Sequence, residues 1–432
     1  MHSDLSNYNI NSFNDKFNEN KDNKKIMKAI NKNGLNKFCI NSKVIEENKP
    51  DFNIELKDTK RMNQKNSLRC WIYAGLNFVK RDMAQNLNID VLDFELSPTF
   101  IAFYDRLEKA NSFYNSIINK KVDLSKMNKD KMFDEPDTEK GRFELFRAIV
   151  NKYGIVPYKT MKDTKDSLNS EMFNLIFNEN IRKHCTLLIK CKEEKEDLYV
   201  LKEKILYKDY EFLCKVIGMP PQKFNYRYTN LKNEKVTLKN ITPLEFKDKF
   251  LKINLDEYVT IWNVESYNKE LYKKYRYRDS GNVYKKSYME YINLPIERIK
   301  ELVSMQLKDN LPVMFDTEIL KFRDSTNGVL DTRLYDYSKY LPYESINRSD
   351  ALNLKDIFAR HVMNFTGVKT ENGKFIRWKV EDSYGSKKHY NGYYIMNDNF
   401  FSKFVFGVTI NKKYLNKKEI NILNSTPIII DE

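Results

Sequence analysis

Cys70 differs from the other cysteines of this sequence because it stands at the start of a helical pattern. It follows the polar, turn-like segment NQKNS at 63–67 and precedes apolar residues that recur at helical spacing through 71–83. A thiol at a helix N-terminus meets the positive end of the helix dipole and free backbone N–H groups, and both favour the thiolate. The position makes Cys70 a candidate nucleophile, with a structural cysteine as the alternative.

The other four cysteines form no Cys-x-x-Cys pair, and their spacing is too irregular for a disulfide framework. Cys185 and Cys191 flank the sequence TLLIK, with His184 beside them. This spacing is not that of a zinc site, so we expect a buried strand that carries unreactive thiols. An odd number of unpaired cysteines is typical of a reducing cytosol. The remaining two are Cys39 and Cys214.

A carboxylate is predicted to lie beside one histidine. Asn-Gly at 372–373 separates two runs rich in β-branched and aromatic residues, 361–368 and 375–382, which predicts a β-hairpin. With a two-residue turn, His361 and Asp382 become diagonal neighbours on one face of the hairpin. An imidazole with an orienting carboxylate is half of a catalytic triad, although a lone histidine in a strand is more often structural. The other histidines have no comparable partner in the pattern: His2 in the N-terminal tail, His184 and His389.

The elements that must position these side chains are helices first and strands afterwards, an α+β order. Apolar periodicity and capping signals predict helices at 70–86, 95–119, 141–153 (ended by Gly154) and 295–307, with a further possible helix at 23–32. Strands are expected at 259–264 and throughout the last third of the chain.

Composition excludes several classes of protein. The chain has 432 residues, of which 41% are hydrophobic and 31% charged, with only 12 Gly and 11 Pro, so it is globular rather than collagen-like or disordered. No apolar run approaches the roughly 18 residues of a membrane helix, and the polar start lacks the core of a signal peptide. The net charge of +15 permits nucleic-acid binding, but acids are interspersed and no nucleic-acid motif accompanies it, which favours a Lys-rich surface.

Several segments together resemble the papain-superfamily cysteine peptidases of the bleomycin hydrolase and aminopeptidase C family. NQKNSLRCWIYAGLN resembles the nucleophile segment of that family, RHVMNFTGV its histidine segment, and RWKVEDSYG the segment of its orienting Asn. FELSPTFIAFYDRLEKANSFYNSII, KYGIVPYKTM and YYIMNDNFFSKFVF extend the similarity in the same order over nearly the whole chain. The resemblance implies a papain-like α+β fold, made of a helical lobe and a barrel-like β lobe with a large insertion between them.

The resemblance also assigns roles. It implies that Cys70 is the nucleophile, that His361 is its base and that Gln64 supplies the side-chain amide of the oxyanion hole. Asp382 occupies the place of the orienting Asn, where its charge should stabilise the imidazolium. The mechanism implies no metal or organic cofactor.

Other residues are expected at the substrate cleft. Trp71 and Tyr384 occupy aromatic positions that flank the site, and Tyr384 stands where the family has Trp. Leu68 replaces the Gly of the family pattern S-G-R-C-W and is expected to reshape the cleft. These departures leave open a catalytically weakened relative, used as a scaffold or for nucleic-acid binding.

The C-terminal arm is expected to set the mode of cleavage. In the family the arm enters the cleft, and its terminal carboxylate holds the amino group of the substrate. Here the chain reads STPIIIDE and stops at Glu432, so we expect a shortened arm and endopeptidase or oligopeptidase action. An aminopeptidase is the alternative, because the two final acidic residues could still attract an ammonium group.

These expectations divide the chain into 1–50, an N-terminal extension; 51–120, the helical lobe with the nucleophile; 121–300, the insertion; 301–415, the β lobe with His and Asp; and 416–432, the arm. The resemblance implies peptide substrates, a homohexamer and a cytoplasmic location. Ser67 supports that location, because secreted papain-like enzymes carry a disulfide cysteine at the corresponding position. No membrane partner is expected.

Overall fold

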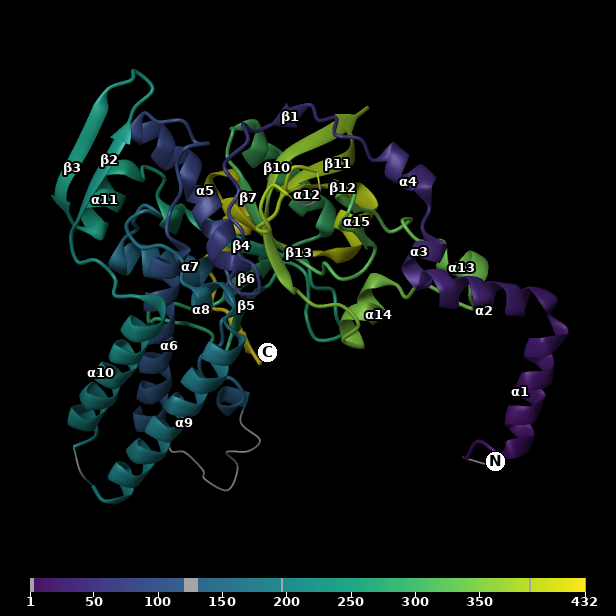
Figure 1. Ribbon diagram of the computed structural model, residues 1–432, viewed down its shortest axis with the longest axis horizontal. Coiled ribbons are helices and arrows are strands. Elements are labelled where there is room, and N and C mark those ends of the chain that lie inside the picture. Colours follow the sequence, from purple (N-terminus) through teal and green to yellow (C-terminus); the bar gives the residue numbers. More distant parts are fainter. Residues whose placement is uncertain (1–3, 120–130, 196, 388–389, 432) are drawn as a thin grey trace.

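A computed structural model describes residues 4–119, 131–195, 197–387 and 390–431, in which a helical lobe packs against a β lobe (Figure 1). Within these ranges no helix combines the length and the apolar character needed to cross a membrane. The helical lobe contains α5 (Cys70–Leu87), α6 (Pro98–Asn119), α7 (Phe143–Tyr153), α8 (Lys165–Leu168), α9 (Glu171–Glu193), α10 (Leu198–Ile217), α11 (Pro243–Phe250) and the hairpin of β2 (Phe224–Thr229) and β3 (Lys235–Ile241).

The β lobe is built on a twelve-stranded sheet, in which eleven strands have the order β14-β5-β6-β4-β13-β7-β10-β11-β12-β9-β8 and β1 is the twelfth, paired with β10. Its strands are β1 (Ile54–Glu55), β4 (Tyr258–Trp262), β5 (Lys274–Tyr277), β6 (Glu290–Asn293), β7 (Val313–Thr317), β8 (Arg323–Asp324), β9 (Val329–Leu330), β10 (His361–Glu371), β11 (Lys374–Glu381), β12 (Tyr393–Asn397), β13 (Val405–Asn411) and β14 (Ile428–Ile430). The helices around it are α12 (Ile296–Lys308), α13 (Tyr337–Tyr340), α14 (Arg348–Asn353), α15 (Asp398–Phe404) and α16 (Lys417–Leu423).

The central strands β7 and β10 are covered on both faces, so all of β7 and the first eight residues of β10 are buried. Met314 and Val362 pack into the helical core on the α5 side. Phe315 and Met363 face the opposite way, into the core beneath α12 and α15. The sheet therefore holds the helical lobe directly against the strand that begins with His361.

Most of the predicted helices are present. α5, α6, α7 and α12 match the expected segments to within three residues at each end, and Gly154 caps α7 with a φ of +84°. The α+β class is confirmed. Strands β4, β5 and β6, from the expected insertion 121–300, join the main sheet alongside the strands of the last third.

The predicted hairpin is also confirmed, as β10 and β11. Asn372 and Gly373 both have positive φ angles, as a two-residue type I′ turn requires. The pairing of Asn364 with Glu381 at the far end keeps the predicted register, although two irregularities interrupt the ladder between them.

The expected buried strand around Cys185 and Cys191 is wrong, because this segment lies within the 23-residue helix α9. The buried positions of α9 recur with a helical period and face α6 and α10. The short run TLLIK suggested a strand only because it was considered apart from the longer helical pattern around it. Both thiols are buried.

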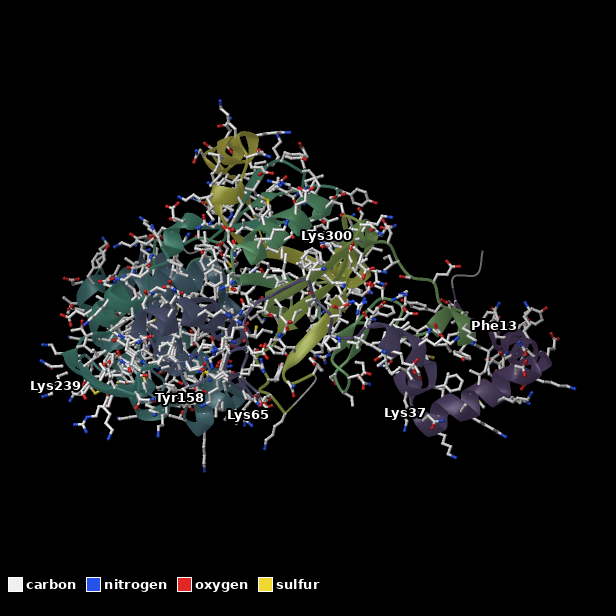
Figure 2. All side chains as sticks on the ribbon, turned by 90° about the horizontal axis from the view of Figure 1, so that it is seen from above. Phe13, Lys37, Lys65, Tyr158, Lys239 and Lys300 are labelled. Carbon is white, nitrogen blue, oxygen red and sulfur yellow. The ribbon has the colours of Figure 1, made fainter. Side chains whose placement is uncertain are left out.

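The described part of the N-terminal extension forms α1 (Asn7–Glu19), α2 (Lys21–Asn33), α3 (Leu35–Cys39) and α4 (Ser42–Glu47). The possible helix at 23–32 is thus confirmed as part of α2. Figure 1 and Figure 2 show α1 and α2 standing away from the two lobes, with Phe13 on the outlying arm. The extension is fastened farther along, where Asn41 N donates to Leu334 O and Asp336 N to Cys39 O.

Candidate active site

Cys70 is the first residue of α5 and lies where that helix meets the β lobe. Its side chain is nearly buried, with 8% of the residue exposed. The amide Nδ2 of Asn364 on β10 donates to the carbonyl oxygen of Ala74, 2.9 Å away, and so fastens the nucleophile helix to the histidine strand. The thiol is therefore held at the interface of the two lobes by a hydrogen bond as well as by packing.

His361 opens β10 and links Cys70 to Asp382. Its Nε2 lies 2.8 Å from Asp382 Oδ1, and its side chain is also hydrogen-bonded to the thiol of Cys70. Burial opposes the charged imidazolium, but electrostatic attraction to the Cys70 side chain and the hydrogen bond that His361 donates to Asp382 outweigh it and raise the pKa of His361 to about 10. The geometry thus favours a protonated imidazole between Cys70 and Asp382.

Gln64 approaches the same interface from the turn before α5. Its Nε2 donates to the carbonyl oxygen of Ser67 at 2.7 Å, and its Oε1 accepts a hydrogen bond from the hydroxyl of Ser383. An amide nitrogen has two N–H groups, so one remains for an oxygen at the thiol. Ser383, next to Asp382, therefore orients the amide; its position in the sequence gave no signal for this contact.

The residues expected at the cleft have different environments. Tyr384 is half-buried and stacks on His361 with ring centroids 5.8 Å apart, where it shields the imidazole. Trp71 is fully buried, and its Nε1 donates to Glu139 O at 2.9 Å, so its ring supports the turn from within. Leu68, two residues before Cys70, is half exposed. Glu432 lies outside the described residues, and so do His2 and His389.

The expectation that His184 has no carboxylate partner is wrong. Its Nδ1 lies 3.1 Å from Asp209 Oδ1 and 3.0 Å from the hydroxyl of Tyr114, which itself donates to Asp209. These side chains come from α9, α10 and α6, and spacing along the sequence could not reveal their approach. They form a buried polar link among three helices.

No three His, Cys, Asp or Glu side chains of the described ranges gather in a way that could hold a metal ion.

Comparison with known proteins identifies the family. The Peptidase C1-like family matches residues 4–432. The chain belongs to that family. Aminopeptidase C of Listeria monocytogenes is 31% identical over 432 residues, which cover 100% of this chain and 98% of that protein. Aminopeptidase E of Lactobacillus helveticus is 31% identical over 417 residues, covering 95% and 94% of the two chains.

The fold agrees with this assignment. The crystal structure of PepW from Lactobacillus rhamnosis has a TM-score of 0.94 to this chain with 28% identity, and covers 100% of this chain and 98% of that one. The expected resemblance and the two-lobed α+β fold of the family are thereby confirmed. The protein is a cysteine peptidase.

Sequence reasoning missed a group of charged residues behind the peptidase's thiol. Arg69, immediately before Cys70, forms buried ion pairs with Glu139 and Asp163. Arg142, in the helical lobe, pairs with Asp316 on β7 and so joins the two lobes. Pairs of opposite charge this far apart in sequence leave no periodic signal.

Proposed function

We propose that the protein is an aminopeptidase whose catalytic residues are Cys70, His361 and Asp382, with Gln64 in the oxyanion hole. The hydrogen-bonded series from the thiol through His361 to Asp382 is the observation that supports this most strongly. It lies at the interface of the lobes and needs no further group to generate a nucleophile.

In the proposed reaction, the thiolate of Cys70 attacks the carbonyl carbon of the scissile peptide bond. The oxygen that gains negative charge is held by the backbone N–H of Cys70 and the free N–H of Gln64. The His361 imidazolium then gives its proton to the leaving nitrogen, the C–N bond breaks, and a thioester remains on Cys70. Water, deprotonated by the neutral imidazole, hydrolyses the thioester and regenerates the thiolate and imidazolium.

The curated relatives support removal of N-terminal residues over the endopeptidase action expected from the shortened arm. Relatives that match nearly the whole chain are named aminopeptidase C, E and G. The parallel pairing of β14 with β5 sets Ile430 against the aromatic cluster that includes Trp262. The guanidinium of Arg142, which bridges the lobes, lies 4.5 Å from that Trp262 ring. The described end of the chain therefore lies near a residue that bridges the two lobes.

The test is mass spectrometry of two otherwise identical peptides, one with a free amino terminus and one acetylated. We expect release of single residues from the free peptide, no cleavage of the acetylated one, and no cleavage of either by the Cys70→Ala protein. Internal cleavage of both peptides at equal rates would support an endopeptidase instead.

We also propose that the protein is a homo-oligomer, a hexamer by the family resemblance. The N-terminal helices α1 and α2 support this, because apolar side chains on them are exposed, among them Phe13 at 53% and Phe17 at 43%. Exposed apolar rows of this kind are usually covered by a partner. Native mass spectrometry of the full chain and of a Phe13→Ser, Phe17→Ser variant tests it; a wild-type monomer would contradict the proposal.

A cytoplasmic location remains our inference, supported by five cysteines that all lie in the described residues and form no disulfide there. Cell fractionation with an antibody against the protein tests it, and recovery outside the cytoplasmic fraction would contradict it.

A further inference from the structure

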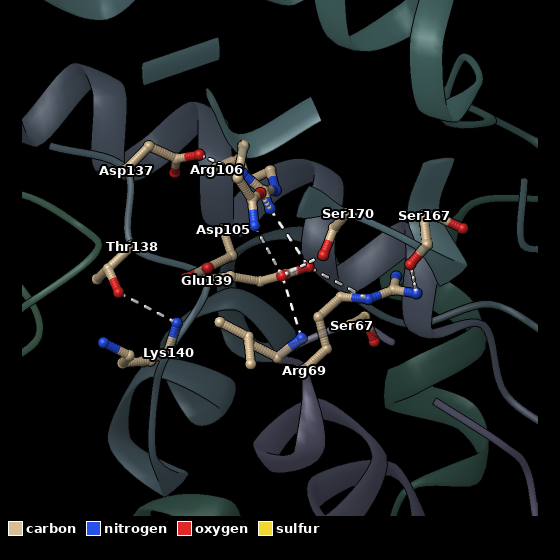
Figure 3. Close-up of polar contacts among 12 residues, drawn as sticks. Ser67, Arg69, Asp105, Arg106, Asp137, Thr138, Glu139, Lys140, Ser167 and Ser170 are labelled. Carbon is tan, nitrogen blue, oxygen red and sulfur yellow. Dashed lines mark hydrogen bonds and ion pairs between the residues drawn. The ribbon is translucent and has the colours of Figure 1, made fainter. Parts of the chain in front are cut away.

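Glu139 is a buried carboxylate in the loop between α6 and α7, with only 4% of the residue exposed. Its Oε2 accepts hydrogen bonds from the backbone N of Leu68 at 3.1 Å, Ser170 Oγ at 2.5 Å and Asn174 Nδ2 at 3.1 Å. Figure 3 shows this carboxylate at the centre of the polar cluster, with Arg69 reaching it from the turn before α5 and Arg106 from α6. A fully occupied acceptor of this kind has little freedom to move.

The contacts of Glu139 bracket the nucleophile on both sides. Before Cys70, its carboxylate binds the N–H of Leu68 and lies 3.7 Å from Arg69 Nε. After Cys70, its backbone oxygen accepts the hydrogen bond from the indole of Trp71. Glu139 thus contacts Leu68, Arg69 and Trp71, three of the four residues at 68–71, and fastens the turn on both sides of Cys70.

The charge of Glu139 is held by its surroundings. Burial favours the neutral acid, but Arg106, the Ser170 hydroxyl and Arg69 together keep the pKa of Glu139 below its usual value. The carboxylate therefore stays ionised, and its hydrogen bonds with Leu68 and Ser170 are charge-assisted. Arg69 is anchored in turn by Asp163, 3.4 Å away.

We propose that Glu139 is a positioning residue, which fixes the turn so that the thiolate and N–H of Cys70 meet His361 and the oxyanion. This inference rests on the proposed role of Cys70. Glu139 does not touch the substrate and acts through the backbone of Leu68 and the side chains of Arg69 and Trp71. A displacement of the thiol by about 1 Å can lower the reaction rate by roughly a hundredfold, so a residue that fixes the position of the thiol has a large effect on that rate.

Glu139→Gln is the decisive variant. Oε2 of Glu139 accepts hydrogen bonds from three donors, and its Oε1 faces two guanidinium groups. The NH2 group of a glutamine would have to take one of these two positions, where it would face donors and could accept no hydrogen bond from them. Asp137→Asn is the matched control. Asp137 is equally buried and also pairs with Arg106, and its hydrogen bonds go to residues other than those of the nucleophile turn.

Two measurements are made on each folded variant, the rate at which iodoacetamide alkylates Cys70 and the values of kcat and KM for a peptide. We expect Glu139→Gln to lower the alkylation rate and kcat at least about tenfold with KM within about twofold. Asp137→Asn should lose comparable thermal stability and keep both rates within about twofold. Ser170→Ala, which removes one donor, should give a smaller loss in the same direction and serves if Glu139→Gln does not fold.

Equal rates for the two variants, per folded molecule, would overturn the proposal, because Glu139 would then act only on stability. So would an unchanged alkylation rate in Ser170→Ala if Glu139→Gln does not fold. Alkylation reports on the thiol without a substrate. A wild-type protein that cleaves no peptide would therefore contradict the proposed function and leave this test intact.

Discussion

Replacing Asp382 by Asn tests the electrostatics of the site, because it exchanges a charged partner of His361 for the neutral one found in the family pattern. The carboxylate accepts from Nε2 at 2.8 Å in a site where both residues are buried. Asn keeps the shape and an acceptor oxygen but removes the negative charge. The hydrogen bond therefore persists, and what changes is the stability of the imidazolium.

The magnitude follows from the difference between hydrogen bonds to charged and to neutral groups. Those to charged groups contribute roughly 1.5–3 kcal/mol and neutral ones roughly 0.5–1.5, a difference of about 1–1.5 kcal/mol. Since about 1.4 kcal/mol corresponds to a tenfold change in a protonation equilibrium, the pKa of His361 in Asp382→Asn should fall by about one. It stays above the ordinary value, because attraction to the Cys70 thiolate raises it as well.

The sign of the pH effect is definite. Because the pKa of His361 is raised to about 10, the imidazolium persists from neutral pH until the pH passes that value. In Asp382→Asn it should be lost at lower pH, so the alkaline limb of kcat/KM moves toward neutral by about one pH unit. Activity at pH 6–7 should change little, since the imidazolium is still present there.

The assay is the pH dependence of kcat/KM between pH 5 and 11, measured with the wild type, Asp382→Asn and the matched control Glu381→Gln. Glu381 is an adjacent buried carboxylate whose contacts are Thr59 and Arg81 rather than His361. We expect the control to keep the alkaline limb of the wild type. If the limb of Asp382→Asn coincides with that of the wild type, or moves to higher pH, the charge of Asp382 does not stabilise the imidazolium and the reasoning fails.

Three further predictions follow from the geometry. Cys70→Ser should lower the rate of peptide cleavage at least about a thousandfold, because a hydroxyl does not ionise beside His361. It should also abolish labelling by a thiol-directed epoxide, and labelling of the variant would contradict this prediction. Gln64→Ala should lower kcat about a hundredfold with little change in KM, as steady-state kinetics will show, because one oxyanion donor is lost; a change in KM alone would assign Gln64 to binding. Arg142→Met should lower the free energy of unfolding, measured with denaturant, by about 3 kcal/mol, because it leaves Asp316 charged and buried. The double variant Arg142→Met, Asp316→Leu should recover most of that loss. If the single and double variants lose the same free energy of unfolding, the ion pair contributes little.

The elements that carry the site were predictable because their signals are local. The helix that begins at Cys70 has an apolar period and a polar turn before it, and the hairpin is specified by Asn372 and Gly373. The register then follows from the turn, so His361 and Asp382 could be placed together without tertiary information. Local chemistry was sufficient wherever the partners lie in one hairpin.

Contacts between distant elements were not predictable, because nothing in the sequence specifies which faces of two helices will meet. His184 was expected to be isolated and instead binds Asp209 across the α9–α10 interface. Glu139 and Asp316 were not singled out, although Glu139 pairs with Arg69 next to Cys70 and Asp316 pairs with Arg142 between the lobes. Burial of opposite charges depends on the tertiary fold alone.

The two main departures from the family pattern affect different parts of the enzyme. Leu68 stands where the family has Gly, yet its backbone is not among those with positive φ, so the turn itself does not require glycine there. Its N–H is held by Glu139 while half of the residue is exposed. In the proposed site, the leucine would therefore change the surface that substrates meet while leaving the turn intact. Asp382 is buried against the imidazole of His361, where it carries a negative charge that the Asn of the family pattern lacks. Leu68 should therefore govern which peptides fit, and Asp382 the pH range in which the thiolate is paired with an imidazolium.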